Sequence, residues 1–437
     1  MKNHKVIGLA LLLVLFAANA NMLVNTPLGS AATSGYSSGL IAELGEASTT
    51  LIYSTITATV NMPVPDANMN PTANVVSVLL TVGIAGSGFF AGSTGYIVTA
   101  GHVAYCFTQD NFAQDPSTRI FVMTQSFDVL VQALQQQANY NYNPAQQAAL
   151  LTYMQNNGQF QSTPIRVVYA VLGKVKATLT EIEAKGWVAR VVAVSPYIER
   201  DLALLKVEGL TNCPVLTIGD SDKITTGYNV YMFGFPDVLS FQLPSAQTIL
   251  APSMTSGIIS AERITNFDTP CFQTDASITH GMSGGPGLNT NGEVIGICSR
   301  GAVTEANQEA AGFNFLIQSN VLQSLLTESS IANTKGPVDE TFLKGLNYYY
   351  EHHYSAAKAQ LEIVTGLFSY HWRAEDLILE CNAAIARGED VPLGLGIETW
   401  ILLAALIAGV AVVAVVAVTL VQRRKSHLNV NASVNAS

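Results

Sequence analysis

Apolar segments mark the two ends of the chain, and shorter ones fill the region between them. Val6 to Phe16 is apolar, and Trp400 to Val421 carries no charged residue. From Val75 to Ile317, short β-branched runs alternate with glycine-rich turns, which is typical of sandwiches and barrels. Helical spacing of apolar residues interrupts this pattern at 110–160 and replaces it after Lys335. The pattern predicts a mainly β domain with inserted helices and separate terminal segments.

The first 20 residues are typical of a secretory signal. Lys2 and Lys5 precede the apolar run, and Ala18-Asn19-Ala20 offers small residues for cleavage after Ala20. An uncleaved anchor is the alternative. Residues 21–72 are rich in Ser, Thr, Ala and Gly and nearly free of charge, which predicts a flexible arm or stalk. Within them, the run from Thr49 to Val60 could add a strand.

The C-terminal apolar segment, 400–421, is long enough to cross a bilayer. Trp400 stands where an interfacial aromatic belongs, and Arg423-Arg424-Lys425 follow the span, which places the tail 422–437 in the cytoplasm. With a signal at the other end, we expect a single-pass protein of the cell membrane whose bulk lies outside.

The β domain is expected over 73–330, with a closing helix from Ser319 to about Leu326. The insertion at about 110–160 reads as a helical hairpin, which could be a lid, a partner-binding surface or a surface insertion. Three further helices are expected over 338–387, joined to the membrane segment by a linker, 388–399. Their spacing fits one tetratricopeptide-type repeat with a capping helix, and a plain three-helix bundle fits equally well. This module could bind peptides or partner subunits.

Composition narrows the classes of function. The chain has 437 residues, 49% hydrophobic and 12% charged, with a net charge of −10, so nucleic-acid binding has no electrostatic support. Its five cysteines show no CxxC or His-Cys spacing, and we expect neither a metal nor a cofactor. The redox compartment permits disulfides, but the spacing does not select a pairing.

Three short motifs carry candidate chemistry. Ser283 stands between glycines in His280-Gly281-Met282-Ser283-Gly284-Gly285, where N–H groups can turn toward a developing oxyanion. A serine needs a base, and His102 follows the expected strand 96–100. Asp201 precedes the apolar strand 202–207. The order His, Asp, Ser is that of chymotrypsin.

These motifs and their flanks resemble the HtrA/DegP branch of trypsin-like serine proteases. The resemblance rests on the segments Gly86-Ser87-Gly88-Phe89, Tyr96 to Val103, Arg200 to Val207, Ile218 to Asp222, Thr255 to Ala261, Thr274 to Gly287, Gly292 to Ile297 and Gly312 to Asn320. It covers roughly residues 75 to 327. It implies a chymotrypsin-like double β-barrel, here followed by a small all-α module and one transmembrane helix.

The resemblance also implies roles. Ser283 would be the nucleophile, His102 the general base and acid, and Asp201 the residue that orients the imidazole. The N–H groups of Gly281 and Ser283 would form the oxyanion hole, and 299–301 (Ser299, Arg300 and Gly301) would bind substrate. No PDZ-like domain follows the protease, and Met282 stands where the family usually has Asn, so what holds the oxyanion loop is left open.

From these points we expect a membrane-anchored, extracytoplasmic serine endopeptidase that acts through an acyl-enzyme. Its polypeptide substrates would be misfolded or surface proteins. Family relatives are often trimers, which makes a homo-oligomer an expectation by analogy. The alternative is a catalytically silent chaperone or partner-binding protein that keeps the protease fold.

Overall fold

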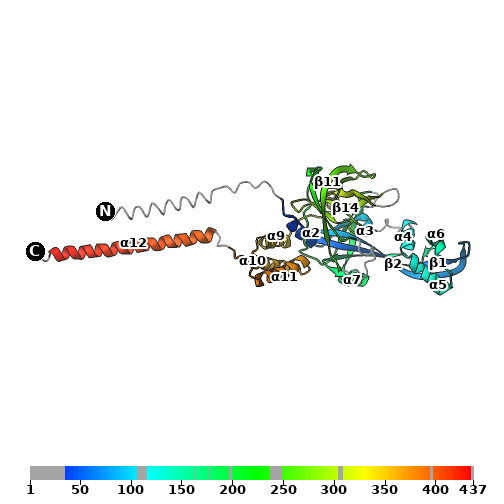
Figure 1. The fold of residues 1–437 in the computed structure, drawn as a ribbon, viewed down its shortest axis with the longest axis horizontal. Coiled ribbons are helices and arrows are strands. Elements are labelled where there is room, and N and C mark those ends of the chain that lie inside the picture. Colours follow the sequence, from blue (N-terminus) through cyan, green and yellow to red (C-terminus); the bar gives the residue numbers. More distant parts are fainter. Residues whose placement is uncertain are drawn as a thin grey trace.

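The structure is a computed structural model that describes residues 35–105, 116–161, 163–176, 178–195, 199–236, 249–303, 309–393 and 397–434. Two β-barrels form its centre, inserted helices lie at one end, and a long terminal helix extends from the other (Figure 1). The expected signal segment, 1–20, lies outside the described residues.

The first barrel is a closed sheet of six strands in the order β2-β3-β8-β7-β5-β1, with β1 pairing back to β2. Its strands are β1 (Thr49–Pro65), β2 (Pro71–Gly92), β3 (Tyr96–Ala100), β5 (Ile165–Leu172), β7 (Trp187–Ser195) and β8 (Leu202–Lys206). β4 (Gln159–Phe160) adds to β1 at its far end. Ile52, Ile97 and Leu205 are fully buried in one apolar cluster, as the alternation of strand side chains requires.

The second barrel is closed in the order β11-β12-β15-β14-β13-β9. Its strands are β9 (Asn229–Gly234), β11 (Ser253–Ile264), β12 (Pro270–Thr274), β13 (Pro286–Leu288), β14 (Val294–Val303) and β15 (Glu309–Gln318). Phe89 and Val98 of the first barrel pack with Phe233 and Ile297 of the second. The predicted double barrel is therefore confirmed. The apolar contact between these strand residues holds the two barrels together.

Short elements connect and close the barrels. They are α3 (Gly101–Tyr105), β6 (Val175–Lys176), α7 (Leu179–Lys185), η2 (Ser221–Lys223), β10 (Ile249–Leu250) and α8 (Ser319–Glu328). β6 and β10 pair as a separate ribbon. The expected closing helix corresponds to α8.

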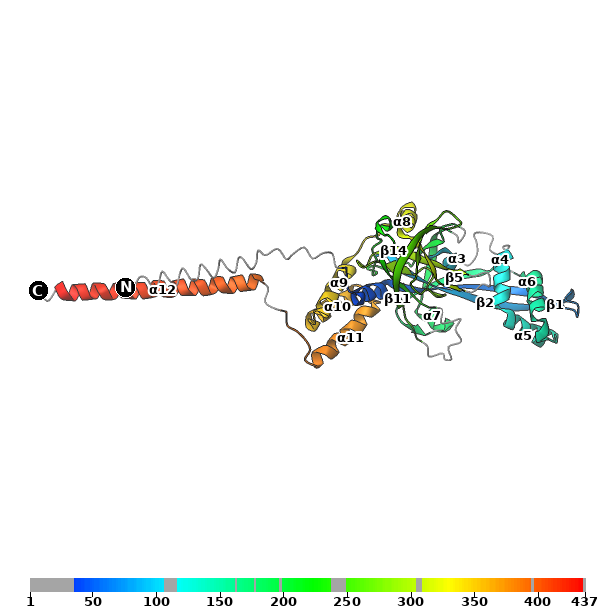
Figure 2. The ribbon, with the colours of Figure 1, turned by 45° about the horizontal axis from the view of Figure 1, so that its top comes forward.

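The inserted helices pack on the far part of the β1–β2 hairpin. They are α4 (Pro116–Gln125), α5 (Phe127–Ala138), η1 (Pro144–Gln146) and α6 (Gln147–Asn157). Leu130, Leu134 and Met154 are fully buried against Val60 and Leu80 of the hairpin. Both views place these helices at the end of the molecule away from α9–α11 (Figures 1 and 2).

The flexible arm expected over 21–72 is not what the structure has from residue 35 onward. α2 (Ser38–Ser48) begins at the Ser37 cap, whose hydroxyl oxygen accepts from Leu40 N–H. β1 follows it directly and pairs with β2 from Thr49 to Pro65. The β-branched run that suggested a strand is thus part of the first barrel, and the low charge of the segment reflects burial.

The C-terminal helices α9 (Pro337–Tyr350), α10 (Tyr354–Leu367) and α11 (Trp372–Ala386) pack in sequence, with α10 against both others. Their apolar faces join the cluster of the first barrel, and Phe368 makes an edge contact with Phe90 at 6.4 Å between ring centroids. The three expected helices are therefore present, and their buried side chains belong to the same apolar core as those of the first barrel.

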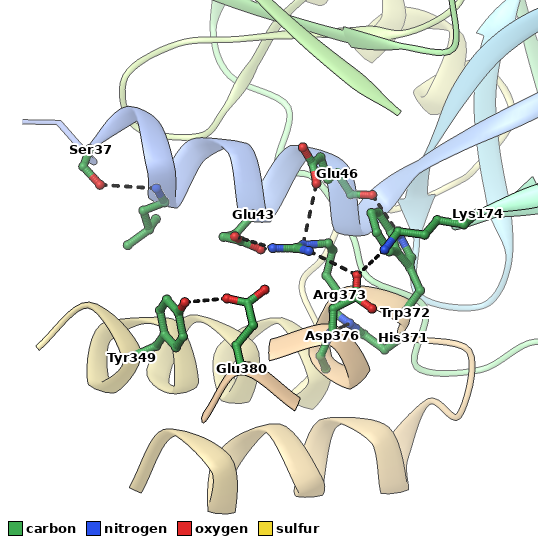
Figure 3. A network of polar contacts seen from close by, with 12 residues as sticks. Ser37, Glu43, Glu46, Lys174, Tyr349, His371, Trp372, Arg373, Asp376 and Glu380 are labelled. Carbon is green, nitrogen blue, oxygen red and sulfur yellow. Dashed lines mark hydrogen bonds and ion pairs between the residues drawn. The ribbon is translucent and has the colours of Figure 1, made fainter. Parts of the chain in front are cut away.

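A half-buried ion-pair network fastens α11 to α2. Arg373 pairs with Glu43 at 2.5 and 2.7 Å, and Glu46 and Asp376 lie within 3.6 and 3.3 Å of the same guanidinium. Trp372 donates to the carbonyl of Glu46. Figure 3 shows these side chains reaching across from α11 to α2. α2 is therefore held against the C-terminal helices by directed contacts.

The last element, α12 (Ile397–Val434), contains a candidate span, Ala404–Arg424, of 21 residues with mean hydropathy 2.8 and no residue buried in the structure. The helix stands clear of the barrels (Figure 2). By length and composition it is able to cross a membrane.

Candidate active site

The histidine and the aspartate come from neighbouring strand ends of the first barrel. β3 ends at Ala100, and His102 lies in the short helix α3 that follows. β3 pairs with β8, so that Ala100 is opposite Leu202 and the residue before β8, Asp201, lies beside the start of α3. The pairing register thus places the two side chains together, although they are far apart in sequence.

The Asp201 carboxylate holds the imidazole of His102 at two points. His102 Nδ1 lies 3.0 Å from both carboxylate oxygens, and the His102 backbone N–H donates to Oδ1 at 3.0 Å. Because a carboxylate only accepts, Nδ1 carries the proton and Nε2 keeps a lone pair for a base. The His102 side chain is 29% exposed, so this base lies at the surface of the site.

Asp201 itself is fully buried. Its third donor is Ser299, whose hydroxyl is 2.5 Å from Oδ2. A buried carboxylate needs several donors to offset the loss of hydration, and these three supply them. Asp201 also has φ of 50°, a left-handed conformation that costs about 1 kcal/mol for a non-glycine residue. The site thus keeps a charged and mildly strained residue in place through its hydrogen bonds.

The loop before β13 carries Ser283 with its hydroxyl turned toward β14. Ser283 Oγ donates to the Ser299 carbonyl at 3.2 Å, and within the described residues no hydrogen bond joins it to His102. Such nucleophile–base contacts are often open in the absence of substrate.

Two N–H groups of this loop are left for a ligand. In the part of the chain that the structure describes, the N–H groups of Gly281 and Ser283 make no hydrogen bond. The N–H of Met282 between them is taken by the Thr279 carbonyl at 3.1 Å. Gly281 has φ of 87°, which a residue with a Cβ rarely adopts. This is the donor arrangement that stabilises an oxyanion.

Met282 anchors the loop through apolar packing. Its side chain is only 1% exposed and lies in the core of the second barrel with Met232, Phe272 and Leu316. No charged partner is needed for such burial, which at about 25 cal/mol per Å² contributes roughly 2 kcal/mol for a Met side chain. The departure from the family pattern at this position is thus accommodated by the barrel core.

The expected substrate-binding segment, 299–301, lies in β14 at a bulge. Cys298 pairs with Leu316 and Arg300 with Phe315, so Ser299 is the extra residue. The bulge turns the Ser299 hydroxyl to Asp201 and its carbonyl to Ser283. Ser299 therefore supports the His102–Asp201 pair, a role the sequence analysis did not assign to it. The side chains of Arg300 and Gly301 are not among those described.

Cys298 lies beside the serine loop, but its thiol is a poor nucleophile. Burial, and then the charge of Asp201, raise the pKa of the Cys298 thiol, which keeps it protonated. The described cysteines are all buried: Cys213, Cys271, Cys298 and Cys381. Cys106 lies outside the described residues. Among those residues, no group of three His, Cys, Asp or Glu side chains is placed to hold a metal ion.

Sequence comparison gives the class of this domain. Residues 86–297 match the family model described as "Trypsin-like peptidase domain". That range contains His102, Asp201 and Ser283 and parts of both barrels. This part of the chain is therefore similar to trypsin-like peptidase domains.

Its relatives define the branch. The chain is 34% identical over 152 residues to "Serine protease HTRA4" of Mus musculus, covering 33% of this chain and 28% of that protein. It is 34% identical over 149 residues to "Probable periplasmic serine endoprotease DegP-like" of Marinomonas sp. (strain MWYL1), covering 33% and 28%. Within this range the chain is similar to HtrA-type serine proteases. The match spans little more than a quarter of these relatives' length.

A solved structure gives a weaker likeness. "HtrA-type protease AlgW with decapeptide" aligns with a TM-score of 0.40 and 19% identity, covering 67% of each chain. The fold is established by the two closed barrels themselves.

Proposed function

We propose that this chain is a membrane-anchored, extracytoplasmic serine endopeptidase in which Ser283, His102 and Asp201 act together. The observation that carries the proposal is the Asp201–His102 pair, set beside a serine loop with two unbonded N–H groups. Acyl transfer requires these parts: a nucleophile, an oriented base and donors for the oxyanion.

The reaction would follow from the geometry. Ser283 Oγ leaves the Ser299 carbonyl, gives its proton to His102 Nε2 and attacks the scissile carbonyl. The oxygen becomes negative against the N–H groups of Gly281 and Ser283. His102 then protonates the leaving amine, and the acyl-enzyme forms. Water, deprotonated by the same imidazole, releases the second product. Asp201 stays ionised throughout and stabilises the imidazolium.

The location and substrates of the enzyme are part of the same proposal. α12 supplies one apolar span, and the basic residues after it favour a cytoplasmic tail. The catalytic domain would then face outward, where misfolded or surface polypeptides are its substrates. The similarity to proteins named as periplasmic endoproteases supports this side of the membrane. A homo-oligomer is proposed by analogy with HtrA relatives alone.

A fluorophosphonate probe applied to the full-length chain in detergent micelles tests the catalytic claim. We expect labelling of the wild type and none of Ser283→Ala, with casein cleavage lowered by at least about 10⁴-fold in that variant. Ser256→Ala, which removes an exposed serine of β11 in the same barrel, is the matched control and should cleave normally. Persistent cleavage by Ser283→Ala would point to another nucleophile. Absence of labelling in folded wild type would favour the silent chaperone instead.

A further inference from the structure

Ser87 of β2 is a fully buried serine whose every polar atom is bonded. Its hydroxyl donates to the Gly281 carbonyl at 2.7 Å and accepts from the Phe235 N–H at 2.8 Å. Its N–H donates to the Ser283 carbonyl at 2.7 Å, and its carbonyl accepts from Thr99 Oγ at 2.6 Å. One residue of the first barrel thus contacts the histidine strand, the end of β9 and the serine loop.

The direction of the hydroxyl bond is set by its surroundings. Because the Phe235 N–H can only donate, the Ser87 oxygen accepts from it, and the hydroxyl proton is left for Gly281. The residue therefore holds the Gly281 carbonyl by its side chain and the Ser283 carbonyl by its backbone. In the sequence, the segment Gly86-Ser87-Gly88-Phe89 contributes only to the family resemblance and does not indicate this contact.

These two bonds fix alternate peptide planes of the loop. In a trans peptide the C=O and the following N–H point to opposite sides. Holding the Gly281 carbonyl therefore turns the Met282 N–H away, toward Thr279. Holding the Ser283 carbonyl turns the Gly284 N–H toward the Cys298 carbonyl, at 2.7 Å. The N–H groups of Gly281 and Ser283, which belong to the intervening planes, are the ones left unbonded.

The packing leaves no room for this contact to shift. A Cβ on Gly284 would lie 2.2 Å from the Ser87 carbonyl oxygen, and one on Gly234 would lie 2.9 Å from the Ser87 hydroxyl. Such separations are shorter than real Cβ contacts. Gly234 and Gly284 of the second barrel therefore allow Ser87 of the first barrel to approach closely, because they have no Cβ atom.

We propose that Ser87 is a positioning residue that sets the oxyanion-binding geometry of the Gly281–Ser283 loop from the opposite barrel. It touches neither substrate nor the reacting atoms. This inference rests on the proposed function, since it concerns how the same loop stabilises the oxyanion. It also makes the catalytic geometry depend on correct docking of the two barrels, because the loop and the residue that holds it belong to different barrels.

The test uses Ser87→Ala in the full-length chain, with kcat normalised to the sites titrated by fluorophosphonate. We expect kcat on a fluorogenic peptide to fall about 10- to 100-fold, approaching the loss of an oxyanion donor. KM should stay within about twofold, and the shape of the pH profile of kcat should not change. Affinity for a peptide boronic acid, which forms a tetrahedral adduct with the serine, should fall by the same factor as kcat.

Ser48→Ala is the matched control, because Ser48 is another buried serine that donates to a backbone carbonyl, that of Pro214, at 2.8 Å. Thr99→Val is the second variant should Ser87→Ala not fold. It removes the bond to the Ser87 carbonyl and should lower kcat and boronate affinity together by about threefold, a fraction of the loss of one donor.

The outcomes separate the two claims. Three results would overturn the positioning role and leave the proposed function intact. They are a Ser87→Ala variant with wild-type kcat and boronate affinity, a loss of kcat in Ser48→Ala equal to that in Ser87→Ala, and a Ser87→Ala variant in which KM alone changes. A wild type that neither cleaves peptides nor binds the boronate would overturn the proposed function and, with it, this inference.

Discussion

Two sets of helices lie outside the barrels, and they are attached in different ways. α9–α11 share one apolar cluster with the first barrel, in which Phe342 and Phe368 are grouped with Ile97 and Leu205. α4–α6 form their cluster with the distal part of the β1–β2 hairpin. Helices at the end of a sequence are here part of the catalytic body, whereas helices inserted between His102 and Asp201 form an appendage.

Polar contacts follow the same division. α11 reaches α2 through the bidentate Arg373–Glu43 pair. α9 reaches the barrel through Asp339, whose carboxylate accepts from the Val215 and Gly336 N–H groups at 2.7 Å each. Among the described residues, the inserted helices are joined to the hairpin mainly by apolar packing, and Tyr153 donates a hydrogen bond to the Pro63 carbonyl. The difference teaches that position in sequence is a poor guide to which helices support catalysis.

Truncating Phe342 should have the largest effect on the catalytic body. The side chain is 2% exposed and stacks on His371 with ring centroids 4.3 Å apart. Phe342→Ala should lower the free energy of unfolding of the whole body by about 3–5 kcal/mol. Scanning calorimetry and residual casein cleavage after heating measure this. A separate low-temperature transition that leaves cleavage intact would show that α9–α11 unfold on their own, contrary to the comparison.

Breaking the Arg373 network should have the next largest effect. Arg373→Ala leaves the half-buried Glu43 without its partner, which should cost about 2 kcal/mol, less than the loss of one partner of a fully buried pair. The double variant Arg373→Met, Glu43→Leu removes both charges and should recover most of the loss. Urea unfolding followed by tryptophan fluorescence compares the two. Equal destabilisation in the single and double variants would mean that the guanidinium acts through packing rather than charge.

Asp339 should make the same junction sensitive to pH. Burial is the main cause that raises its pKa to about 6, outweighing the two N–H donors that lower it. The folded chain therefore holds this proton more tightly than the unfolded chain. The stability from this group is fully present below the unfolded pKa, near 4, and is lost as pH rises through 6.

The difference in unfolding midpoint between wild type and Asp339→Asn separates the effect of this carboxyl group from that of the other carboxylates. We expect the wild-type unfolding midpoint, relative to that of Asp339→Asn, to rise by a few degrees as pH falls from 7 to 4. The lost acceptor in the variant should add only a constant offset. A difference that does not vary over this range would show that Asp339 titrates normally.

The parts of the structure that sequence reasoning predicted well are those with local signals. Strand alternation, glycine turns and the order of His102, Asp201 and Ser283 sufficed for the double barrel and for the similarity to trypsin-like peptidases. α2 was missed because its partners are distant: Glu43 and Arg373 are separated by 330 positions. Low charge in that segment was interpreted as flexibility, whereas it reflects a buried helix and strand.

Roles within the site were harder to predict than its members. The expected substrate contact of Ser299 stays a prediction. The sequence did not indicate that the Ser299 hydroxyl donates to Asp201, because this contact depends on a β-bulge that turns the side chain inward. Ser87 gave no chemical signal of its own. Its role depends on the docking of one barrel against the other, and neither hydrophobic period nor motif spacing encodes that contact.

The smallest effect on catalysis is expected from the inserted helices. Leu130 is fully buried, and Leu130→Ala should destabilise the cluster around α5 by about 2–4 kcal/mol. Because that cluster lies on the far hairpin and excludes the His102 strand, kcat/KM on a small peptide and the midpoint of heat inactivation should both match wild type.

Hydrogen exchange should show the loss confined to α4–α6 and the distal hairpin, with the amides of β3 and β8 still protected. A fall in kcat/KM comparable to that of Phe342→Ala would mean that the hairpin transmits order from the insertion to the serine loop. Since β2 also carries Ser87, that result would make the insertion a distant support of the oxyanion site rather than an appendage.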